Sequence, residues 1–255
     1  MVRALRAARL PAPDALTGDV LEACAKAGVF RLRAAVVGPV AFQSYAGVLG
    51  VRIPATLSRT EVEHSMVLLV EDKIDRDLAK ILKDVDSRFE GIPDPIDAGR
   101  IVRFTLRVGS KEHFSVDLLS PEHGSYRGRL GELRARRSSA RLLRFVDYLL
   151  YQEVNAVCLY GAGVPINVPA PERYALAKLL VAQMRRAVQR SHAKASEDLE
   201  QAIALISILN EVRKGDLADA WEDLRNRGPS WRQKADRSLL QLPAEMCTVL
   251  TGWAR

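Results

Sequence analysis

The sequence has few of the residues that build disulfide-linked or zinc-bound small domains. Its 255 residues include three cysteines and four histidines. Cys24, Cys158 and Cys247 form no CxxC pair and lie in apolar surroundings, which is typical of buried thiols in a reducing compartment. The histidines show no metal-ligand spacing. We therefore expect neither a disulfide framework nor a zinc site.

Long apolar runs are also missing. No stretch approaches the ~20 residues of a membrane span. The segment Met1–Arg9 is short and basic, and Pro11 and Pro13 follow it in place of the apolar core of a signal peptide. We therefore expect a cytoplasmic protein with no membrane partner.

The overall balance is that of a folded globular protein. Hydrophobic residues make up 48% of the chain and charged residues 27%, and the length allows a sizeable core. The formal net charge is +7. This basic character suits a polyanionic partner such as RNA, and it suits a solvated basic surface equally well. No feature of the sequence predicts an oligomeric state.

The first half of the chain alternates helix and strand patterns. Residues 14–28 are predicted to form a helix with Asp14 as its cap and Gly28 as its end. A strand at 30–37, the Gly38-Pro39 turn and a helix at 40–49 follow, and proline is well tolerated at a first helical position. Further on we expect a strand at 60–70, a helix at 75–85, and a hairpin of strands 101–108 and 113–119. This order predicts an α/β (α+β) fold with a mixed sheet and flanking helices.

The second half differs in texture. An arginine-rich stretch leads to a β-hairpin at 155–168, in which Gly161 and Gly163 form the turn. Helices are expected at 171–190, 194–213 and 216–227, followed by a short tail. We therefore predict an α/β domain at 1–123, a connection with a hairpin at 124–170, and a helical domain at 171–255.

Three acidic residues are candidates for a metal site. Glu61 and Glu63 are two apart in a predicted strand, so both side chains leave the same face. Asp117 lies in a later strand that can run beside them. Carboxylate oxygens are suitable ligands for Mg²⁺, and paired metal ions about 4 Å apart support phosphoryl transfer. An acidic pair on a strand is also common on solvated faces, so the pattern alone leaves both interpretations open.

The order of these features resembles that of the nucleotidyltransferase superfamily. A strand, a glycine turn and a helix precede an acidic pair, and a single acid follows on another strand. Val36–Pro54 resembles the first motif of a bacterial nucleotidyltransferase-like family of unassigned substrate, and Phe114–Pro121 resembles its third-acid strand. The resemblance continues through segments 143–149, 161–178, 194–202, 216–222 and 227–231.

This resemblance implies an activity and its residues. The expected reaction transfers a nucleoside monophosphate from a nucleoside triphosphate (NTP) to a hydroxyl of RNA, protein or a small molecule, with Mg²⁺ or Mn²⁺. The implied metal ligands and catalytic acids are Glu61, Glu63 and Asp117. The implied nucleotide-binding residues are Gly38, Pro39, Lys178, Arg185 and Lys194. Lys178 resembles the basic residue that reaches the triphosphate in toxin-type relatives, although an exposed helix lysine explains it equally well.

Two departures from the family pattern keep a second interpretation open. Pro39 stands where the family has serine or threonine, which removes a hydroxyl and a backbone donor. Glutamate replaces aspartate at both positions of the pair and moves each carboxylate outward by roughly one ångström. The second interpretation is a catalytically degenerate protein that binds nucleotide or nucleic acid and has a regulatory role.

A third function and an acceptor-binding surface are also compatible with the sequence. A toxin of a toxin–antitoxin or phage-defence pair is a third interpretation, which follows from distant relatives alone. The arginine-rich cluster Arg127–Arg144 is either a surface that binds an RNA or protein acceptor or a solvated linker.

Overall fold

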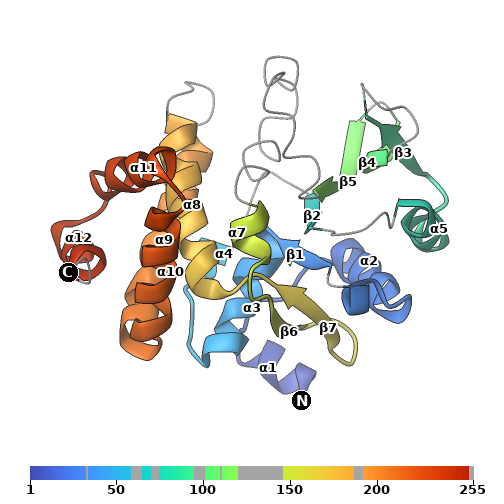
Figure 1. Ribbon diagram of the computed structural model, residues 1–255. Coiled ribbons are helices and arrows are strands. Elements are labelled where there is room, and N and C mark those ends of the chain that lie inside the picture. Colours follow the sequence, from blue (N-terminus) through green and yellow to red (C-terminus); the bar gives the residue numbers. More distant parts are fainter. Residues whose placement is uncertain are drawn as a thin grey trace. The chain divides into compact units, whose positions relative to one another are not determined.

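The computed structural model describes residues 1–32, 34–58, 65–69, 75–94, 101–109, 111–119, 146–186 and 192–252 (Figure 1). They fall into two compact units, Met1–Pro169 (unit 1) and Ala170–Arg255 (unit 2). Unit 1 combines strands with helices, and unit 2 is helical in its described part. The predicted α/β class with a helical C-terminal part is confirmed. Within the described ranges, no helix is long and apolar enough to cross a membrane.

The helices of unit 1 include the three that the sequence predicts and three further short ones that it does not. They are α1 (Val2–Ala7), α2 (Ala15–Lys26), α3 (Pro39–Leu49), α4 (Ala55–Ser58), α5 (Asp75–Val85) and α7 (Val146–Leu150), with a 3₁₀ turn η1 (Val29–Leu32). The Asp14 side chain caps α2 by accepting a hydrogen bond of 3.0 Å from the Thr17 N–H. The helices predicted at 14–28, 40–49 and 75–85 are therefore confirmed.

The strands of unit 1 form a five-stranded sheet and a separate hairpin. They are β1 (Ala35–Val37), β2 (Ser65–Leu69), β3 (Phe89–Pro93), β4 (Ile101–Val108), β5 (Lys111–Leu119), β6 (Val154–Cys158) and β7 (Val164–Val168). The sheet order is β1-β2-β5-β4-β3. β2 and β5 run parallel, and the other neighbouring pairs run antiparallel. The predicted mixed sheet is confirmed.

Two local predictions differ from the structure. Part of the strand expected at 30–37 forms the η1 turn, because the Arg31 N–H bonds to the Gly28 carbonyl at 2.9 Å and Gly28 adopts a φ of 81°. The sequence pattern also does not predict β3, because this strand contains Gly91 and Pro93. Proline is accepted there because β3 lies at the edge of the sheet.

The two faces of the sheet differ in polarity at β4 and β5. Cross-strand partners point to the same side of a sheet. One face carries buried apolar residues, and the rings of Phe89 and Phe114 meet edge-to-face with centroids 6.2 Å apart. The other face carries Arg103 and Thr105 of β4 opposite Asp117 and Ser115 of β5. The apolar residues are Met66, Leu68, Phe104, Leu106, Phe114 and Val116.

The β6–β7 hairpin is fixed to the segment that precedes β1. The Asn167 side chain donates hydrogen bonds to the carbonyls of Phe30 (2.7 Å) and Ala34 (3.1 Å). The Tyr45 hydroxyl of α3 donates to the Pro169 carbonyl at 2.9 Å. The glycine turn of the hairpin is confirmed. These bonds connect the hairpin and the residue that follows it to the segment before β1 and to α3.

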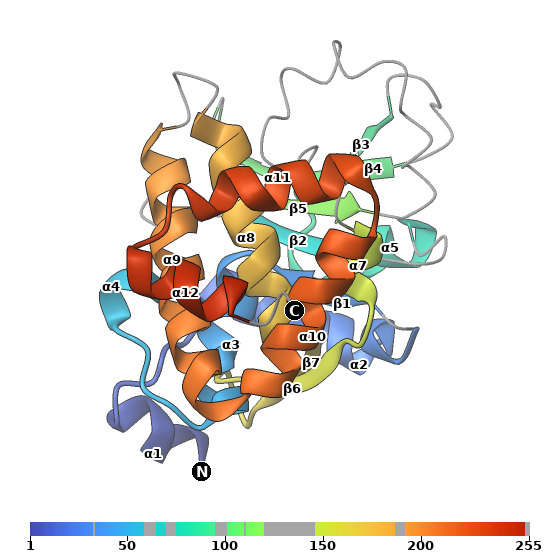
Figure 2. The ribbon, with the colours of Figure 1, turned by 60° about the vertical axis from the view of Figure 1, so that its left-hand side comes forward.

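Unit 2 is a group of packed helices (Figure 2). They are α8 (Pro171–Arg186), α9 (His192–Val212), α10 (Lys214–Asn226), α11 (Pro229–Leu239) and α12 (Ala244–Thr251). α8 lies along α9, and α10 packs against α8, α9 and α11. Trp221 of α10 is buried in this core. The short tail expected after residue 227 is in fact two helices, α11 and α12.

Candidate functional site

Asp117 lies on β5 and is the one predicted acidic ligand within the described residues. It is buried, with 12% of its side chain exposed. Its partner on the parallel strand β2 is Val67, and its partner on β4 is Arg103. Ser65 pairs in the same way with Ser115. The described strand positions beside Asp117 therefore carry no acid.

The other two predicted ligands, Glu61 and Glu63, lie outside the described residues, as does the arginine-rich cluster Arg127–Arg144. Within the described part of the chain, no group of three or more histidine, cysteine, aspartate or glutamate side chains is arranged to hold a metal ion. The three-acid site therefore remains a prediction of the sequence.

Gly38 lies at the end of β1 and begins α3 as its N-terminal cap residue. Its φ of 80° belongs to the region that favours glycine. Pro39 occupies the first helical position, and the Phe42 N–H bonds to the Gly38 carbonyl at 3.1 Å. The predicted strand, glycine turn and helix are therefore all present.

One row of residues across the sheet connects this turn with the acid. Val37 of β1 pairs with Val67 of β2, and Val67 pairs with Asp117 of β5. Neighbouring strands are about 4.8 Å apart, so Val37 and Asp117 lie roughly 10 Å from each other. Gly38 follows Val37 directly. The sheet thus brings two of the predicted site residues, Gly38 and Asp117, into one neighbourhood.

Arg103 also lies in this neighbourhood, and no sequence motif predicts it as a site residue. Its Nε atom lies 3.5 Å from Asp117 Oδ1. Its Nη2 atom donates to Glu112 Oε1 at 2.6 Å and to Ser115 Oγ at 2.7 Å. The pairing of residue 103 with residue 117 follows from a register shift between Leu106 and Arg107, which the sequence pattern does not predict. The guanidinium supplies a positive charge next to the Asp117 carboxylate.

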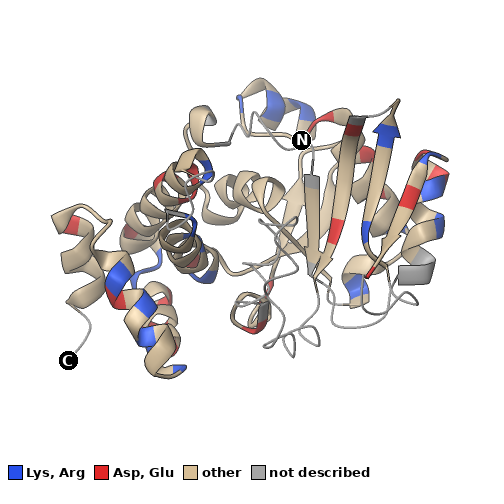
Figure 3. Cartoon of the chain, turned by 90° about the horizontal axis from the view of Figure 1, so that it is seen from above, with Lys and Arg blue, Asp and Glu red and all other residues tan. Residues whose placement is uncertain are grey.

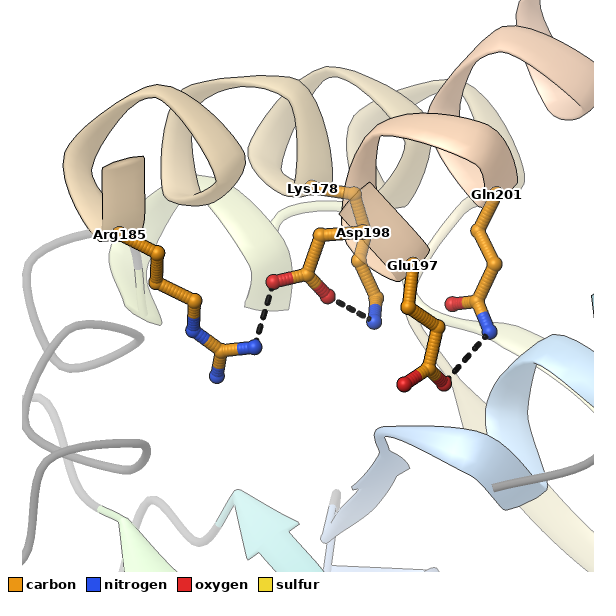
Figure 4. Close-up of polar contacts among 5 residues, drawn as sticks. All are labelled: Lys178, Arg185, Glu197, Asp198 and Gln201. Carbon is orange, nitrogen blue, oxygen red and sulfur yellow. Dashed lines mark hydrogen bonds and ion pairs between the residues drawn. The ribbon is translucent and has the colours of Figure 1, made fainter. Parts of the chain in front are cut away.

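The predicted basic residues of unit 2 gather around one buried carboxylate (Figure 4). Lys178 and Arg185 of α8 each contact Asp198 of α9 at 2.5 Å, one at each carboxylate oxygen. Burial lowers the pKa of Lys178, but the Tyr174 phenol and the Asp198 carboxylate more than offset this, so the pKa is raised overall. Lys178 is thus not the exposed lysine of the alternative interpretation.

Two further residues of α9 border this cluster. Glu197 accepts a hydrogen bond of 3.3 Å from the Gln201 amide (Figure 4), and burial raises the pKa of its carboxyl. Lys194, the third predicted basic residue, is half-buried, and burial lowers its pKa. Two cations share one carboxylate at Asp198, and the Glu197 carboxyl interacts electrostatically with the same basic residues.

The cysteines and the described surface charges point to no other site. Burial raises the pKa of Cys24 and Cys158 to about 12, so neither thiol ionises at neutral pH. Basic and acidic positions are interspersed along the helices of unit 2 (Figure 3).

Comparison with known proteins identifies the family. A family model described as nucleotidyltransferase matches residues 15–226. Among solved structures, an antigenic nucleotidyltransferase-like protein from Paracoccidioides brasiliensis is 18% identical, with 89% of this chain and 94% of that chain covered and a TM-score of 0.41. The curated proteins contain no significant match. On the family match, which spans the β1–α3 turn, the Asp117 strand and the Lys178 helix, the chain belongs to the nucleotidyltransferase family.

Proposed function

We propose that this protein transfers a nucleoside monophosphate from an NTP to an acceptor hydroxyl and releases pyrophosphate. Family membership supports the reaction class. The observation that carries the proposal is the row Val37–Val67–Asp117, which sets a helix-opening glycine turn and a buried acid roughly 10 Å apart on one sheet. A triphosphate bound between them can bridge this span.

The start of α3 offers donors for phosphate oxygens. The first N–H groups of a helix have no acceptor within the helix, and the positive end of the helix dipole lies there. In α3 these donors are the N–H groups of Val40 and Ala41, since Pro39 has none. Gly38 carries no side chain that would keep a ligand from this backbone. The turn is therefore suited to an anionic ligand in spite of the proline.

Asp117 suits one ligand position of a Mg²⁺ or Mn²⁺ site, because carboxylate oxygens are the donors that these ions prefer. When bound, such an ion would polarise the α-phosphate and make the acceptor hydroxyl easier to deprotonate. Glu61 and Glu63 remain the proposed further ligands. They precede Val67 by six and four residues, so the proposal requires the chain ahead of Ser65 to bring them to Asp117.

Lys178, Arg185 and Lys194 remain proposed phosphate-binding residues in unit 2. Their support is the grouping of three basic side chains around the carboxyls of Asp198 and Glu197. The arginine-rich cluster Arg127–Arg144 likewise remains a proposed surface for an RNA or protein acceptor.

A second candidate function is nucleotide binding without transfer. The observation that favours it is the contact of Arg103 with Asp117, together with the absence of an acid at the described strand positions next to Asp117. An arginine that permanently neutralised this carboxylate would leave the fold able to bind an NTP and unable to hold the ion that transfer needs.

The two functions separate in one labelling experiment. The purified protein is incubated with α-³²P-labelled NTPs, with Mg²⁺ or Mn²⁺, and with total RNA or a protein extract. Transfer attaches the label to an acceptor, and Asp117→Asn abolishes it. The matched control is Asp84→Asn, which removes the same charge from an exposed position on α5. Circular dichroism verifies that both variants are folded.

Binding of a fluorescent NTP is measured in parallel. Binding with Asp117-dependent labelling supports transfer, whereas binding with no labelled acceptor supports the second candidate. Labelling that persists in Asp117→Asn, or a protein that binds no NTP, contradicts the proposed site.

A further inference from the structure

Unit 1 contains a cavity that is not part of the candidate site. Its volume is about 470 Å³, and it lies between α1, α3 and β6, which are neighbours in Figure 1. Volumes of several hundred cubic ångströms are typical of sites that bind small molecules. The described wall consists of α1 with the segment after it, one face of α3, residues 155–159 and the hairpin turn. It includes neither Asp117 nor Lys178.

One face of α3 forms the first side of the cavity. It is lined by Val40, Gln43, Ser44, Gly47 and Val48, whose spacing of three and four residues places them on one side of the helix. An added Cβ at Gly47 would have no neighbour within 4 Å, so the wall leaves open space at this position. Val40 also carries one of the N–H groups at the start of α3. The cavity therefore shares a helix with the Gly38 turn.

The edge of β6 forms a second side. The five consecutive residues from Asn155 to Leu159 all line the cavity. Because side chains alternate between the two faces of a strand, a cavity that touches five consecutive residues lies along the edge of the strand. β6 pairs with β7 at one edge, and at its other edge it pairs with no described strand. This second edge can offer backbone N–H and C=O groups to a ligand.

The side chains of the described wall carry no charge, because none of them belongs to Asp, Glu, Lys, Arg or His. Two of the polar side chains are bonded within the protein. Ser44 Oγ donates to the Val40 carbonyl at 2.8 Å, and Asn155 Nδ2 donates to Asn167 Oδ1 at 2.9 Å. A charged ligand would lose hydration here and gain no opposite charge, which is costly. The wall therefore suits an uncharged and mainly apolar occupant.

We propose that this cavity binds an uncharged, mainly apolar small molecule that carries a hydrogen-bonding group. The apolar body of the ligand packs against the side chains of α1 and α3, and burial of this surface supplies the affinity. The polar group bonds to the backbone at the edge of β6. Val157 is 53% exposed and lies where the cavity opens to solvent. The site goes beyond the proposed nucleotidyl transfer and requires neither NTP nor metal.

The first test compares two fluorescent probes that have the same aromatic rings and differ in charge. N-phenyl-1-naphthylamine is uncharged and has an N–H group, and 8-anilinonaphthalene-1-sulfonate adds a sulfonate. The uncharged probe is expected to bind at least about tenfold more tightly, because the wall supplies no cation for the sulfonate. Equal affinities, tighter binding of the sulfonate, or no binding of the uncharged probe would overturn the proposal.

The second test fills the cavity. Gly47→Leu adds a side chain where the wall leaves open space, and leucine is a better helix former than glycine, so the protein is expected to fold. Affinity for N-phenyl-1-naphthylamine is expected to fall at least about tenfold. The control is Lys80→Leu, which places the same side chain at an exposed position on α5 and leaves the affinity unchanged. Equal affinities of the two variants would contradict the proposed site.

The third test changes the charge of the wall and remains informative if Gly47→Leu fails to fold. Val157→Lys places a cation at the exposed rim of the cavity. The preference for the uncharged probe is expected to shrink about tenfold, because the sulfonate now has a partner of opposite charge. An unchanged preference would contradict the role assigned to the uncharged wall.

Light scattering during the titration distinguishes a small-molecule site from an interface between copies. A mass that stays constant as N-phenyl-1-naphthylamine binds supports the proposal. A dimer that dissociates as the probe binds would assign the cavity to the contact between two copies and overturn the proposal. No NTP is present in these measurements. A protein that transfers no label but shows the three affinity changes therefore retains this site and loses only the proposed activity.

Discussion

The Asp198 carboxylate lies between two basic side chains in the core of unit 2, and its charge can be removed with little change of shape. The substitution Asp198→Asn keeps the size of the side chain. In the unmodified protein, Lys178 and Arg185 each contact the Asp198 carboxylate at 2.5 Å. The substitution removes the negative charge of this carboxylate and leaves both basic side chains in place. Their side chains are 15% and 10% exposed, so water reaches them only in part.

The magnitude follows from the burial of the cluster. Breaking a buried ion pair on one side costs roughly 3–5 kcal/mol of unfolding free energy, because an uncompensated charge remains in the interior. Lys178 keeps the Tyr174 ring 5.6 Å from its ammonium group, and both cations retain some solvent. We therefore expect the lower end of this range, about 3 kcal/mol.

Urea unfolding followed by tryptophan fluorescence measures this loss in the relevant unit, because all three tryptophans lie in unit 2. The control is Glu200→Gln, which removes a carboxylate from an exposed position on the same helix and changes stability by no more than about 0.5 kcal/mol. A loss for Asp198→Asn as small as that of the control would refute the view that Asp198 is the electrostatic centre of the unit.

Two further substitutions test packing and burial. Gly18→Ala is expected to destabilise unit 1 by about 1–3 kcal/mol, because the added Cβ would lie 2.1 Å from the Tyr160 ring. Thermal unfolding measures this loss. The control is Gly47→Ala, because an added Cβ at Gly47 would have no neighbour within 4 Å. Burial raises the pKa of Glu172, and a raised carboxyl pKa means that stability is lost as the pH rises through it. Glu172→Gln is therefore expected to stabilise unit 2 at pH 7 and to have no effect on stability at a pH below the ordinary glutamate pKa. Urea unfolding at pH 7 and at this lower pH measures the two effects. Equal effects of the substitution at the two pH values would contradict the expectation.

Most elements of unit 1 could be predicted from the sequence because local signals and tertiary structure agree. Asp14 and Gly28 lie just outside the two ends of α2, and the Gly38-Pro39 turn marks the start of α3. The exceptions have local causes. The apolar, β-branched residues before Gly38 are typical of a strand and form β1, but the residues directly after Gly28 form a 3₁₀ turn, in which Gly28 has a positive φ. The edge strand β3 is not predicted, because Gly91 and Pro93 are residue types that are rare in strands.

The sequence predicts several residues of the candidate site, but it does not predict which charged side chains they contact. The sequence singles out Asp117 and Lys178, but a pattern of residues does not state which charges neutralise them. Arg103 becomes a partner of Asp117 only through the register of the β4–β5 hairpin, and Asp198 joins the two basic residues of α8 only through the packing of α8 on α9. Such partners are far apart in the chain, and the fold determines them.

Hydrogen–deuterium exchange with and without an NTP tests the central claim, a triphosphate bound between the Gly38 turn and Asp117, most directly. The N–H groups of Val40 and Ala41 have no acceptor within α3, so a bound phosphate can become their hydrogen-bond partner. Addition of NTP with Mg²⁺ is expected to slow their exchange, and to do so less in Asp117→Asn. Unchanged exchange at the start of α3 under conditions where NTP binding is saturated would contradict the account.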